Sequence, residues 1–597
     1  MKHTTIWKTL ELFNGVLFHT PKPTQNQNHV EYLDGYIITP GAIWAREIIL
    51  DFYREQKLNG KQLNQTFHKS WNVIKYSSRQ ELLQQQIIHY LSTYGTNFQD
   101  EVYIPNEILK VPDLKISYKV VHAYTKKQLQ EKCLEMLQSG IALKSETIDD
   151  ILHLLLDELQ YEFTGKENIR NKEAICKLVE LYSILPDDPV EFLRYVIFRS
   201  TGETLLIKSP DLINKVKNSV FNPIILFNKY DLKKLSQIYN RFKPLFLAYK
   251  NKCPRTINKL SKYSKKYHKP LVINPINLVT QHPLKEEDVP WLENATIFSL
   301  FKALQACYTR IHKQDHFTYR IRNGKSFTKK NKKANQKVCT YNFNFIIRFL
   351  VTKYNQTGHK FYFPKNIRYA LPTSEKMFVG NIPTGTKFIG KKLVVGIYWR
   401  NDWGAYDLDL SAINLAGKVG WNADYNQQGT LLYSGDMTSA PNGAVEYLHA
   451  DKGLSYPSLI QNNVYHGNND CEYKIVIGKG SNISHAYMIN PNNLMAEVKC
   501  QSKQKQTVLG FMLPADNKQE FVLLNFGAGA ARISTNSPTS EMALKALFQQ
   551  YEKSFNMETL ISYLGGEIVE DKEKADFDFS IDNLQKDSFL KPFNGKI

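Results

Sequence analysis

The sequence has no long uninterrupted apolar run. Its longest apolar stretches, Leu393–Trp399 and residues 343–351, fall well short of the roughly 20 residues that a membrane-spanning helix needs. The N-terminal segment is interrupted by Lys8, Glu11 and Asn14, so it lacks the apolar core of a signal peptide. These absences predict neither a transmembrane helix nor a signal peptide.

Paired cysteines are also missing. The seven cysteines are odd in number and widely separated, and no Cys-x-x-Cys pair occurs. This spacing predicts neither a disulfide framework nor a cysteine zinc site, and it fits a reducing, cytoplasmic compartment. The common sequence motifs of nucleotide-binding proteins, metalloproteases, serine hydrolases and kinases are absent too. The sequence therefore favours a non-enzymatic role without deciding the question.

Acidic residues are missing from one long part of the chain. Residues 232–285 contain thirteen Lys or Arg and no Asp or Glu, and residues 232–374 carry a net charge of +24. The whole chain of 597 residues has a net charge of +20, so the remainder is slightly acidic. The positive charge thus belongs to one region, which predicts a surface for a polyanionic partner.

The composition, 42% hydrophobic and 12% aromatic, is that of a folded chain, and its length predicts several domains. We expect a multidomain α+β protein. Its N-terminal half is mainly α-helical, as a bundle or irregular helical repeat, and a β-sandwich and a short helical and acidic tail follow. The predicted parts are a mixed α/β region (1–115), a helical domain with a basic helix (116–280), a basic connecting region (281–375), the β-sandwich (376–535) and the tail (536–597).

Residues 255–268 predict a helix with a basic stripe. At about 100° per residue, four basic side chains fall within an arc of about 60°, and apolar or small side chains lie opposite. An ordinary solvated helix face mixes charges of both signs, so this stripe favours nucleic acid, and the neighbouring Tyr and Phe residues favour RNA over duplex DNA. The candidate phosphate contacts are Arg255, Lys259, Lys262, Lys266 and Lys269.

A second basic segment, residues 320–337, is expected to be an exposed loop or a flexible arm. Its candidate contacts to nucleic acid are Arg320, Arg322, Lys329, Lys330, Lys332 and Lys333. Two other partners stay open for the basic region: an acidic protein subunit in a virion or stress assembly, and an anionic membrane surface. The acidic tail after Gly566 is an intramolecular candidate that would compete with nucleic acid; a disordered, solubilising tail is the alternative.

Two acidic residues in one strand and a third in a later turn indicate a cation site. In residues 406–412, the two-residue period of a strand places Asp407 and Asp409 on one face, about 7 Å apart. Asp436 lies in an oxygen-rich turn at 433–438. Oxygen ligands with few neighbouring Cys or His favour Ca²⁺ over zinc. The alternative is that these Asp residues only close turns.

The order of motifs in this region resembles the TerD-like domain of tellurium-resistance and bacterial stress proteins. The resemblance covers about 150 residues and implies a calcium-binding β-sandwich with Asp407, Asp409 and Asp436 as ligands. After the Gly-Asp turn, residues 439–451 hold fewer carboxylates than the family pattern. The matching segments are VVGIYW (394–399), DLDLSAINL (407–415), YSGDMT (433–438) and VLGFMLPADNKQEFVLLNFGAG (508–529).

Two further patterns bear on function. Residues 194–209, with the helices that follow, are similar in architecture to the TROVE domain of Ro proteins, which implies RNA as a partner. Glu472 with Lys474, and Glu497 with Lys499, repeat the Glu-x-Lys half of metal-dependent nucleases. The favoured hypothesis is a non-enzymatic, stress- or phage-related nucleic-acid-binding protein with a calcium module; a structural assembly component and a nuclease are the alternatives.

Overall fold

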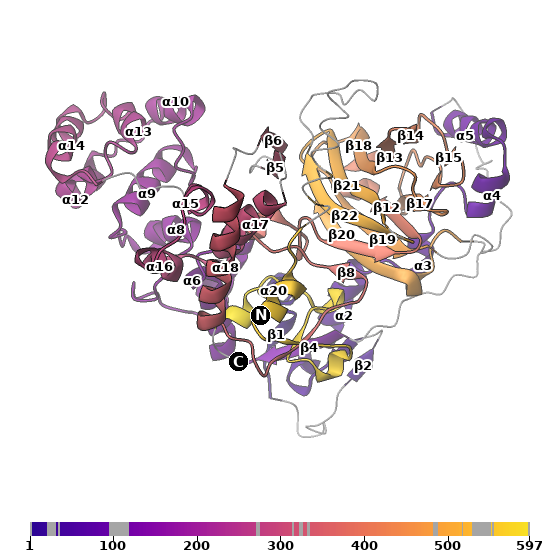
Figure 1. The fold of residues 1–597 in the computed structure, drawn as a ribbon, viewed down its shortest axis with the longest axis horizontal. Coiled ribbons are helices and arrows are strands. Elements are labelled where there is room, and N and C mark those ends of the chain that lie inside the picture. Colours follow the sequence, from indigo (N-terminus) through magenta and orange to yellow (C-terminus); the bar gives the residue numbers. More distant parts are fainter. Residues whose placement is uncertain are drawn as a thin grey trace. The chain divides into compact units, whose positions relative to one another are not determined.

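The computed structural model divides the chain into two compact units (Figure 1). Unit 1 comprises Met1–Thr125 and Val279–Ile597, and unit 2 comprises Lys126–Leu278. Helices dominate the N-terminal half and antiparallel strands the C-terminal half, which confirms the predicted α+β class with a β-sandwich. The structure describes residues 3–20, 31–33, 36–94, 119–269, 275–312, 316–320, 326–330, 335–480, 487–515, 517–527, 548, 551 and 554–594.

Unit 2 is helical. A cap sets the start of its central helix, α9: Asp188 accepts hydrogen bonds from the backbone of Val190 and Glu191, and Pro189 occupies the first helical position. The helices are α6 (Lys126–Gln138), α7 (Ser145–His153), α8 (Lys172–Tyr182), α9 (Pro189–Thr201), α10 (Pro210–Asn218), α11 (Ile224–Lys229), α12 (Leu232–Ser236), α13 (Lys243–Ala248) and α14 (Pro254–Tyr267).

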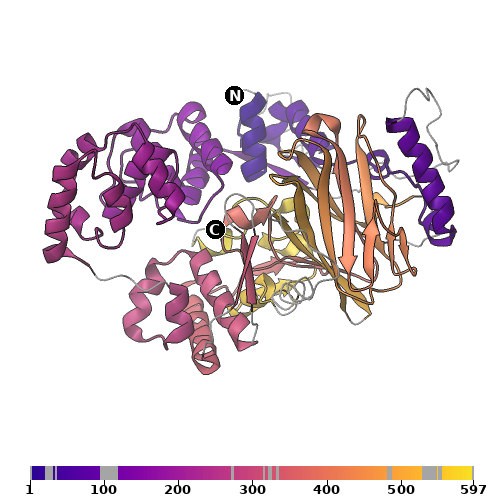
Figure 2. The same cartoon turned by 90° about the horizontal axis from the view of Figure 1, so that it is seen from above.

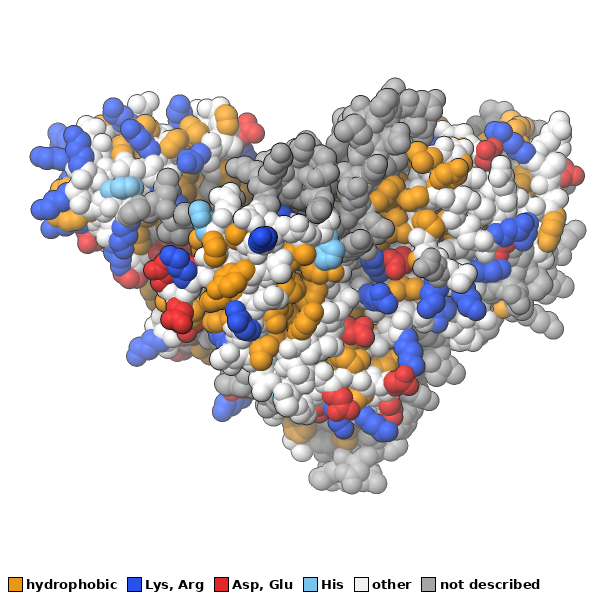
Figure 3. Space-filling model, in the orientation of Figure 1, with side chains coloured by type: hydrophobic (Ala, Val, Ile, Leu, Met, Phe, Trp, Pro, Cys, Tyr) orange, Lys and Arg blue, Asp and Glu red, His pale blue; other side chains and the backbone are white. Residues whose placement is uncertain are grey.

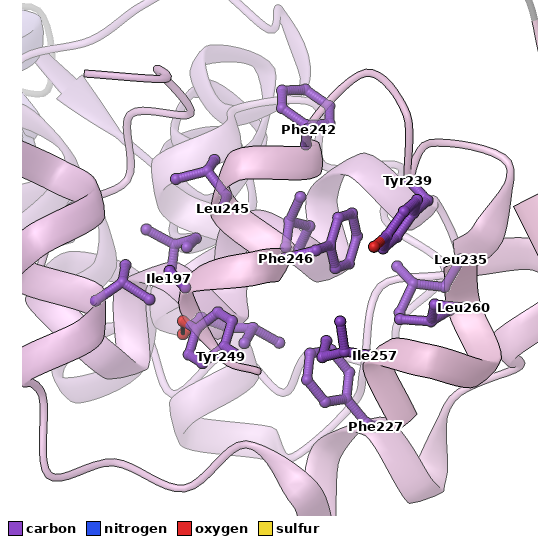
Figure 4. Close-up of a cluster of buried hydrophobic side chains, with 14 of the residues drawn as sticks. Ile197, Phe227, Leu235, Tyr239, Phe242, Leu245, Phe246, Tyr249, Ile257 and Leu260 are labelled. Carbon is purple, nitrogen blue, oxygen red and sulfur yellow. Dashed lines mark hydrogen bonds between the residues drawn. The ribbon is translucent and has the colours of Figure 1, made fainter. Parts of the chain in front are cut away.

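The core of unit 2 explains the orientation of α14. Ile257 and Leu260 of this helix are buried beside Phe227, Phe246 and Tyr249 (Figure 4). Burying two aliphatic side chains contributes on the order of 3–6 kcal/mol, enough to fix which side of the helix faces inward. The predicted amphipathic helix is therefore confirmed, and its charged side faces solvent.

Two antiparallel sheets form the β-sandwich of unit 1, and Figure 2 shows them as two layers. In spatial order, the first sheet has β14 (Gly417–Gly420), β13 (Ala405–Asn414), β18 (Ser458–Gly467), β21 (Gln506–Ala515), β22 (Lys518–Gly527), β11 (Lys387–Gly390) and β8 (Ile367–Arg368). The second has β15 (Asn426–Gln427), β16 (Leu431–Tyr433), β17 (Ala444–Ala450), β12 (Leu393–Trp399), β19 (Glu472–Lys479) and β20 (Leu494–Gln501).

The N-terminal residues pack onto this sandwich. Between strands β3 and β4 of a small sheet, whose spatial order is β1–β4–β3–β2, the chain forms helices that contact the strands and loops of the second sheet. Trp71 Nε1 donates to the carbonyl of Met488, and Tyr447 Oη donates to that of Leu63. The division into units therefore differs from the predicted boundaries, which separate 1–115 from the sandwich. The elements are α1 (His3–Phe13), β1 (Gly15–Leu17), β2 (Glu31–Leu33), β3 (Tyr36–Ile38), α2 (Arg46–Gln56), α3 (Gly60–Leu63), α4 (Trp71–Tyr76), α5 (Arg79–Tyr94) and β4 (Lys119–Tyr124).

The predicted basic arm contains regular structure instead of a continuous loop. Strands β5 (His316–Arg320) and β6 (Ser326–Lys330) pair as an antiparallel hairpin, and α18 begins at Gln336. The physical reason lies in the local sequence, where aromatic and β-branched residues flank an Asn-Gly dipeptide, a pattern typical of a β-hairpin. The expectation of a loop was based on the many basic residues and did not take this pattern into account. Arg320, Lys329 and Lys330 lie in these strands, whereas Arg322, Lys332 and Lys333 lie outside the described residues.

The acidic tail is part of the fold of unit 1. Strands β23 (Glu567–Val569) and β24 (Phe577–Asp578) pair in parallel with the two sides of β7 (Lys360–Tyr362). Lys365 pairs with Glu570 at 2.8 Å, so the tail contacts the basic connecting region. Competition between the tail and nucleic acid stays a prediction. The other described helices of unit 1 are α16 (Val289–Asn294), α17 (Ile297–Ile311), α18 (Gln336–Lys353) and α20 (Met557–Tyr563), and the remaining strands are β9 (Phe378–Val379) and β10 (Ile382–Pro383). Helix α15 (Pro275–Gln281) begins in unit 2 and ends in unit 1.

The sequence predicts neither a transmembrane helix nor a disulfide framework, and both predictions can be compared with the structure. No helix in the described part of the chain combines the length and the hydropathy needed to cross a bilayer. All seven cysteines are buried free thiols, in agreement with the predicted absence of a disulfide framework.

Candidate metal centre and candidate nucleic-acid interface

Strand β13 and the loop after β16 bring the three predicted acidic residues together. In β13, the pairing with β18 is shifted on both sides of Asp407, so a bulge sets the direction of this part of the strand. Asp436 follows Gly435, whose φ of +95° favours glycine. A side chain at Gly435 would also meet His68 at 2.8 Å. The turn that presents Asp436 therefore depends on glycine.

Asp407, Asp409 and Asp436 form a buried acidic cluster, hereafter the Asp triad. One carboxylate oxygen of each lies within 4.8 Å of the other two, and each residue is at most 3% exposed. Asp409 Oδ2 and Asp436 Oδ1 are buried and have no hydrogen-bond partner among the residues that the structure describes. Three converging carboxylates, of which Asp409 and Asp436 each have an unsatisfied oxygen in the described part of the chain, form a donor set suited to a hard cation.

A fourth acidic residue, Glu446 of β17, lies beside the Asp triad. Its carboxylate accepts hydrogen bonds from the backbone of Leu410 and Met437 and from the Tyr433 hydroxyl. These bonds hold Glu446 in place as a fourth acidic group that connects the two sheets. In the sequence, Glu446 lies only ten residues after Asp436, which is weak evidence that the two side chains are close. Its position in β17 explains why its side chain points toward the Asp triad.

Burial and mutual repulsion change the acidity of this cluster. Burial, followed by the charges of Asp436 and Asp407, raises the pKa of Asp409 to about 9, and Lys418 opposes this rise. Burial also raises the pKa of Asp436 and of Glu446. Four acids in this space cannot all ionise without a compensating charge. A bound divalent cation would supply that charge.

Helix α5 covers Asp436 and could not be assigned to the site from the sequence. Gln86 makes two hydrogen bonds to the Asp436 backbone, since its Oε1 accepts from the amide and its Nε2 donates to the carbonyl. The Tyr90 hydroxyl donates to Asp436 Oδ2 at 2.6 Å. His89 lies 3.0 Å from the Thr438 hydroxyl. These residues are about 350 positions from Asp436, and no local pattern signals such a contact.

The candidate nucleic-acid surface is the exposed side of α14, hereafter the α14 basic face. It consists of Arg255, Lys259, Lys262 and Lys266, all of them exposed, and Lys269 is exposed just beyond the helix end. No ion pair involves the four helix residues within the described ranges. Figure 3 shows Lys and Arg crowded on the part of unit 2 that holds α12 and α14, with few acidic side chains among them. The four charges span about 16 Å along the axis.

The Glu-x-Lys residues pair with one another across β19 and β20. Lys474 Nζ is buried, donates to the carbonyls of Glu55 and Gln56, and lies 3.4 Å from Glu497. Lys499 pairs with Glu472 at 2.9 Å. These contacts give the four side chains a structural role that explains their alternation.

The chain matches no protein-family model, no curated protein and no solved structure. The similarity to TerD-like and TROVE domains therefore stays a prediction from the sequence. Function is therefore inferred from the geometry of the Asp triad and of the α14 basic face.

Proposed function

We propose that the β-sandwich of unit 1 is a calcium-binding module, related to the TerD-like domain. The single observation that carries this proposal is the convergence of three buried carboxylates, with oxygens of Asp409 and Asp436 left without hydrogen bonds in the described part of the chain. Burying such charges without a partner costs several kcal/mol per ion, so a compensating cation is the simplest function for the cluster.

The donor set selects the kind of cation. Only oxygen atoms meet at the Asp triad, and zinc or copper would favour His or Cys. Calcium accepts six to eight oxygens in flexible geometry, whereas magnesium demands a near-ideal octahedron. In this proposal, Asp407, Asp409 and Asp436 are the ligands, and Glu446 and α5 hold Asp436 and its loop in place.

Calcium is expected to raise the melting temperature of the protein relative to EDTA. At a free concentration one hundred times the dissociation constant, one site stabilises by about 2.7 kcal/mol. Asp436→Asn should abolish the rise. Asp424→Asn is the control, because Asp424 is half-exposed and pairs with Arg79 outside the triad. Equal melting temperatures of the unmodified protein in calcium and in EDTA would contradict the proposal.

A second candidate function, nucleic-acid binding by unit 2 with RNA as the favoured partner, rests on the α14 basic face. A stripe of exposed cations without acidic partners is suited to successive phosphates, and Tyr263, near the Lys259 ammonium at 5.7 Å, offers a ring for base stacking. Arg320, Lys329 and Lys330 remain candidate contacts from the hairpin of unit 1. An acidic protein subunit and an anionic membrane are the competing partners.

RNA affinity is expected to fall steeply with salt. Each neutralised phosphate contributes about −0.7 to the slope of log K against log salt on single strands, so replacing the four residues of the α14 basic face with Gln should reduce the slope by about 3. The matched control replaces four other exposed lysines of unit 2 with Gln: Lys126, Lys127, Lys166 and Lys208. Equal slopes for the two variants would show that the α14 basic face does not contact the phosphates of RNA.

A further inference from the structure

Two of the buried cysteines lie next to each other in unit 1. Cys307 is in α17 and Cys339 is in α18, and these two helices pack against each other (Figure 1). Both side chains are fully buried, and the Cys307 thiol donates a hydrogen bond to the Cys339 sulfur. Both sulfur atoms also face α15: Cys307 Sγ lies 3.6 Å from the carbonyl oxygen of Val279, and Cys339 Sγ lies 3.9 Å from that of Thr280. The two thiols therefore meet in one place.

Positive charge near the pair favours a thiolate. Cys339 is the fourth residue of α18, where the helix dipole is positive, and the guanidinium of Arg310 acts on both sulfur atoms. Within the described ranges no carboxylate pairs with Arg310, so a thiolate is the anion that would balance it.

The environment distinguishes the two thiols. The hydrogen bond from Cys307 is the main cause that lowers the pKa of Cys339; burial opposes this effect and Arg310 adds to it. The same hydrogen bond, followed by burial, raises the pKa of Cys307. Cys339 therefore ionises more easily, whereas Cys307 keeps its proton. This division is the one that an attacking and a resolving thiol require.

The pair lies where the β5–β6 hairpin leaves and rejoins the two helices. Cys307 precedes the last residue of α17, Ile311, by one helical turn, and Cys339 lies in the first turn of α18. A bond between them would close a segment of about 30 residues that contains the hairpin, and a cross-link of this kind restricts the unfolded chain. Oxidation would therefore join α17 to α18 at the base of a hairpin that carries candidate contacts to nucleic acid.

We propose that Cys307 and Cys339 are a thiol pair that a hydroperoxide oxidises reversibly to a disulfide. The Cys339 thiolate attacks one oxygen of hydrogen peroxide, so an S–O bond forms, the O–O bond breaks, and the hydroxide that leaves takes up a proton to become water. The Cys307 sulfur then attacks the sulfur of this sulfenic acid. The S–S bond forms, the S–O bond breaks, and the oxygen leaves as a second water with the Cys307 proton.

In total the two sulfur atoms lose two electrons, which reduce the peroxide to two waters. A dithiol reductant restores both thiols by thiol–disulfide exchange. The first turn of a helix opens more readily than its middle, which gives a small, neutral oxidant access to Cys339. This proposal depends neither on calcium nor on the α14 basic face.

Treatment of the full chain with excess hydrogen peroxide, followed by alkylation in denaturant and peptide mass spectrometry, tests the proposal. The expected result is one intramolecular disulfide that links the peptides of Cys307 and Cys339, with the other five of the seven cysteines still alkylated. Dithiothreitol should return all seven to the alkylated form. A chain that keeps all seven thiols, a disulfide between other cysteines, or oxidation of this pair to sulfinic acid without a disulfide would each overturn the proposal.

Substitutions separate the roles of the two thiols. In Cys307→Ser the sulfenic acid at Cys339 has no resolving thiol, so dimedone should label Cys339. In Cys339→Ser, labelling of Cys307 should be at least about tenfold weaker, because its thiol stays protonated. Cys176→Ser is the matched control: Cys176 is a buried thiol in a helix of unit 2, and its loss should leave the disulfide intact. Equal labelling of the two single variants, or loss of the disulfide in Cys176→Ser, would contradict the assignment.

The role of the guanidinium has its own test in the unmodified cysteine background. Arg310→Gln should slow disulfide formation by peroxide at least about threefold, because the thiolate loses its nearest cation. Lys302→Gln, at an exposed position of the same helix, should leave the rate unchanged. Equal rates in the two variants would show that Arg310 does not activate Cys339.

Discussion

Truncating the chain after Gly566 is expected to leave unit 1 without a stable fold. The deletion removes β23 and β24, the two neighbours of β7, and with them the rings of Phe577 and Phe579 that stack on Phe361 and Phe363. Burial of a large apolar side chain contributes roughly 1.5–3 kcal/mol, so the loss of several approaches the whole stability of a domain, about 5–15 kcal/mol. The buried apolar side chains removed are Phe579, Leu584, Phe589, Leu590 and Phe593.

Limited proteolysis and thermal unfolding followed by circular dichroism measure this effect. Residues 1–566 should be digested rapidly within unit 1 and should lose the main cooperative transition, whereas Glu573→Gln, at an exposed position of the tail, should change neither result. A truncated chain that melts like the full one would show that the tail is dispensable. Because truncation disturbs the fold, Glu570→Gln, which removes the partner of Lys365, is the suitable test of competition with nucleic acid.

Asp409→Asn is expected to have opposite effects with and without calcium. In EDTA at pH 8, the variant should be more stable than the unmodified protein by a few kcal/mol, because folding no longer requires the carboxyl at position 409 to take up a proton beside Asp407 and Asp436. In saturating calcium, the order should reverse, because the variant has lost a ligand. The two stability curves should therefore cross as the calcium concentration rises.

The pH dependence of the metal-free protein follows from the same carboxyl group. The pKa of Asp409 is raised from 3.8 to about 9 in the folded protein, so between about pH 4 and pH 9 the folded state holds a proton that the unfolded chain has released. Stability should fall as the pH rises through this window and level off above it. Asp409→Asn should flatten this fall.

Urea unfolding at a series of pH values, in EDTA and in calcium, measures both effects. Asp424→Asn, at a half-exposed position, serves as the control for loss of a carboxylate. If Asp409→Asn destabilised the metal-free protein at pH 8, the Asp triad would be held by hydrogen bonds or counter-charges other than a cation. The stability of the unmodified protein would then also show no fall between pH 4 and pH 9.

The Asp triad could be predicted because its signals are local. A two-residue strand period places Asp407 and Asp409 together, and a Gly-Asp turn presents Asp436 close by in the chain. The alternating short strands likewise predicted the sandwich. The amphipathic pattern of residues 255–268 was sufficient to orient α14, since its apolar side faces the core of unit 2.

Other parts depend on contacts that no local pattern encodes. Gln86 and Tyr90 reach Asp436 across about 350 residues. The acidic charge of the tail left open whether it contacts the basic region or forms a disordered tail, and the stacking of Phe577 and Phe579 on Phe361 and Phe363 is not signalled by that charge. In the β5–β6 hairpin, net charge likewise concealed an ordinary strand and turn pattern. Charge composition describes surfaces and does not determine which strands pair.

The central claim, that the Asp triad binds calcium, is tested most directly by calorimetric titration of Ca²⁺ into the metal-free full chain. The predicted result is one calcium per chain, with uptake accompanied by proton release near neutral pH because Asp409 must ionise to act as a ligand. Asp436→Asn should abolish the binding heat, and Asp424→Asn should retain it. Absence of saturable calcium binding by the unmodified protein, or retention of the same site in Asp436→Asn, would contradict the account.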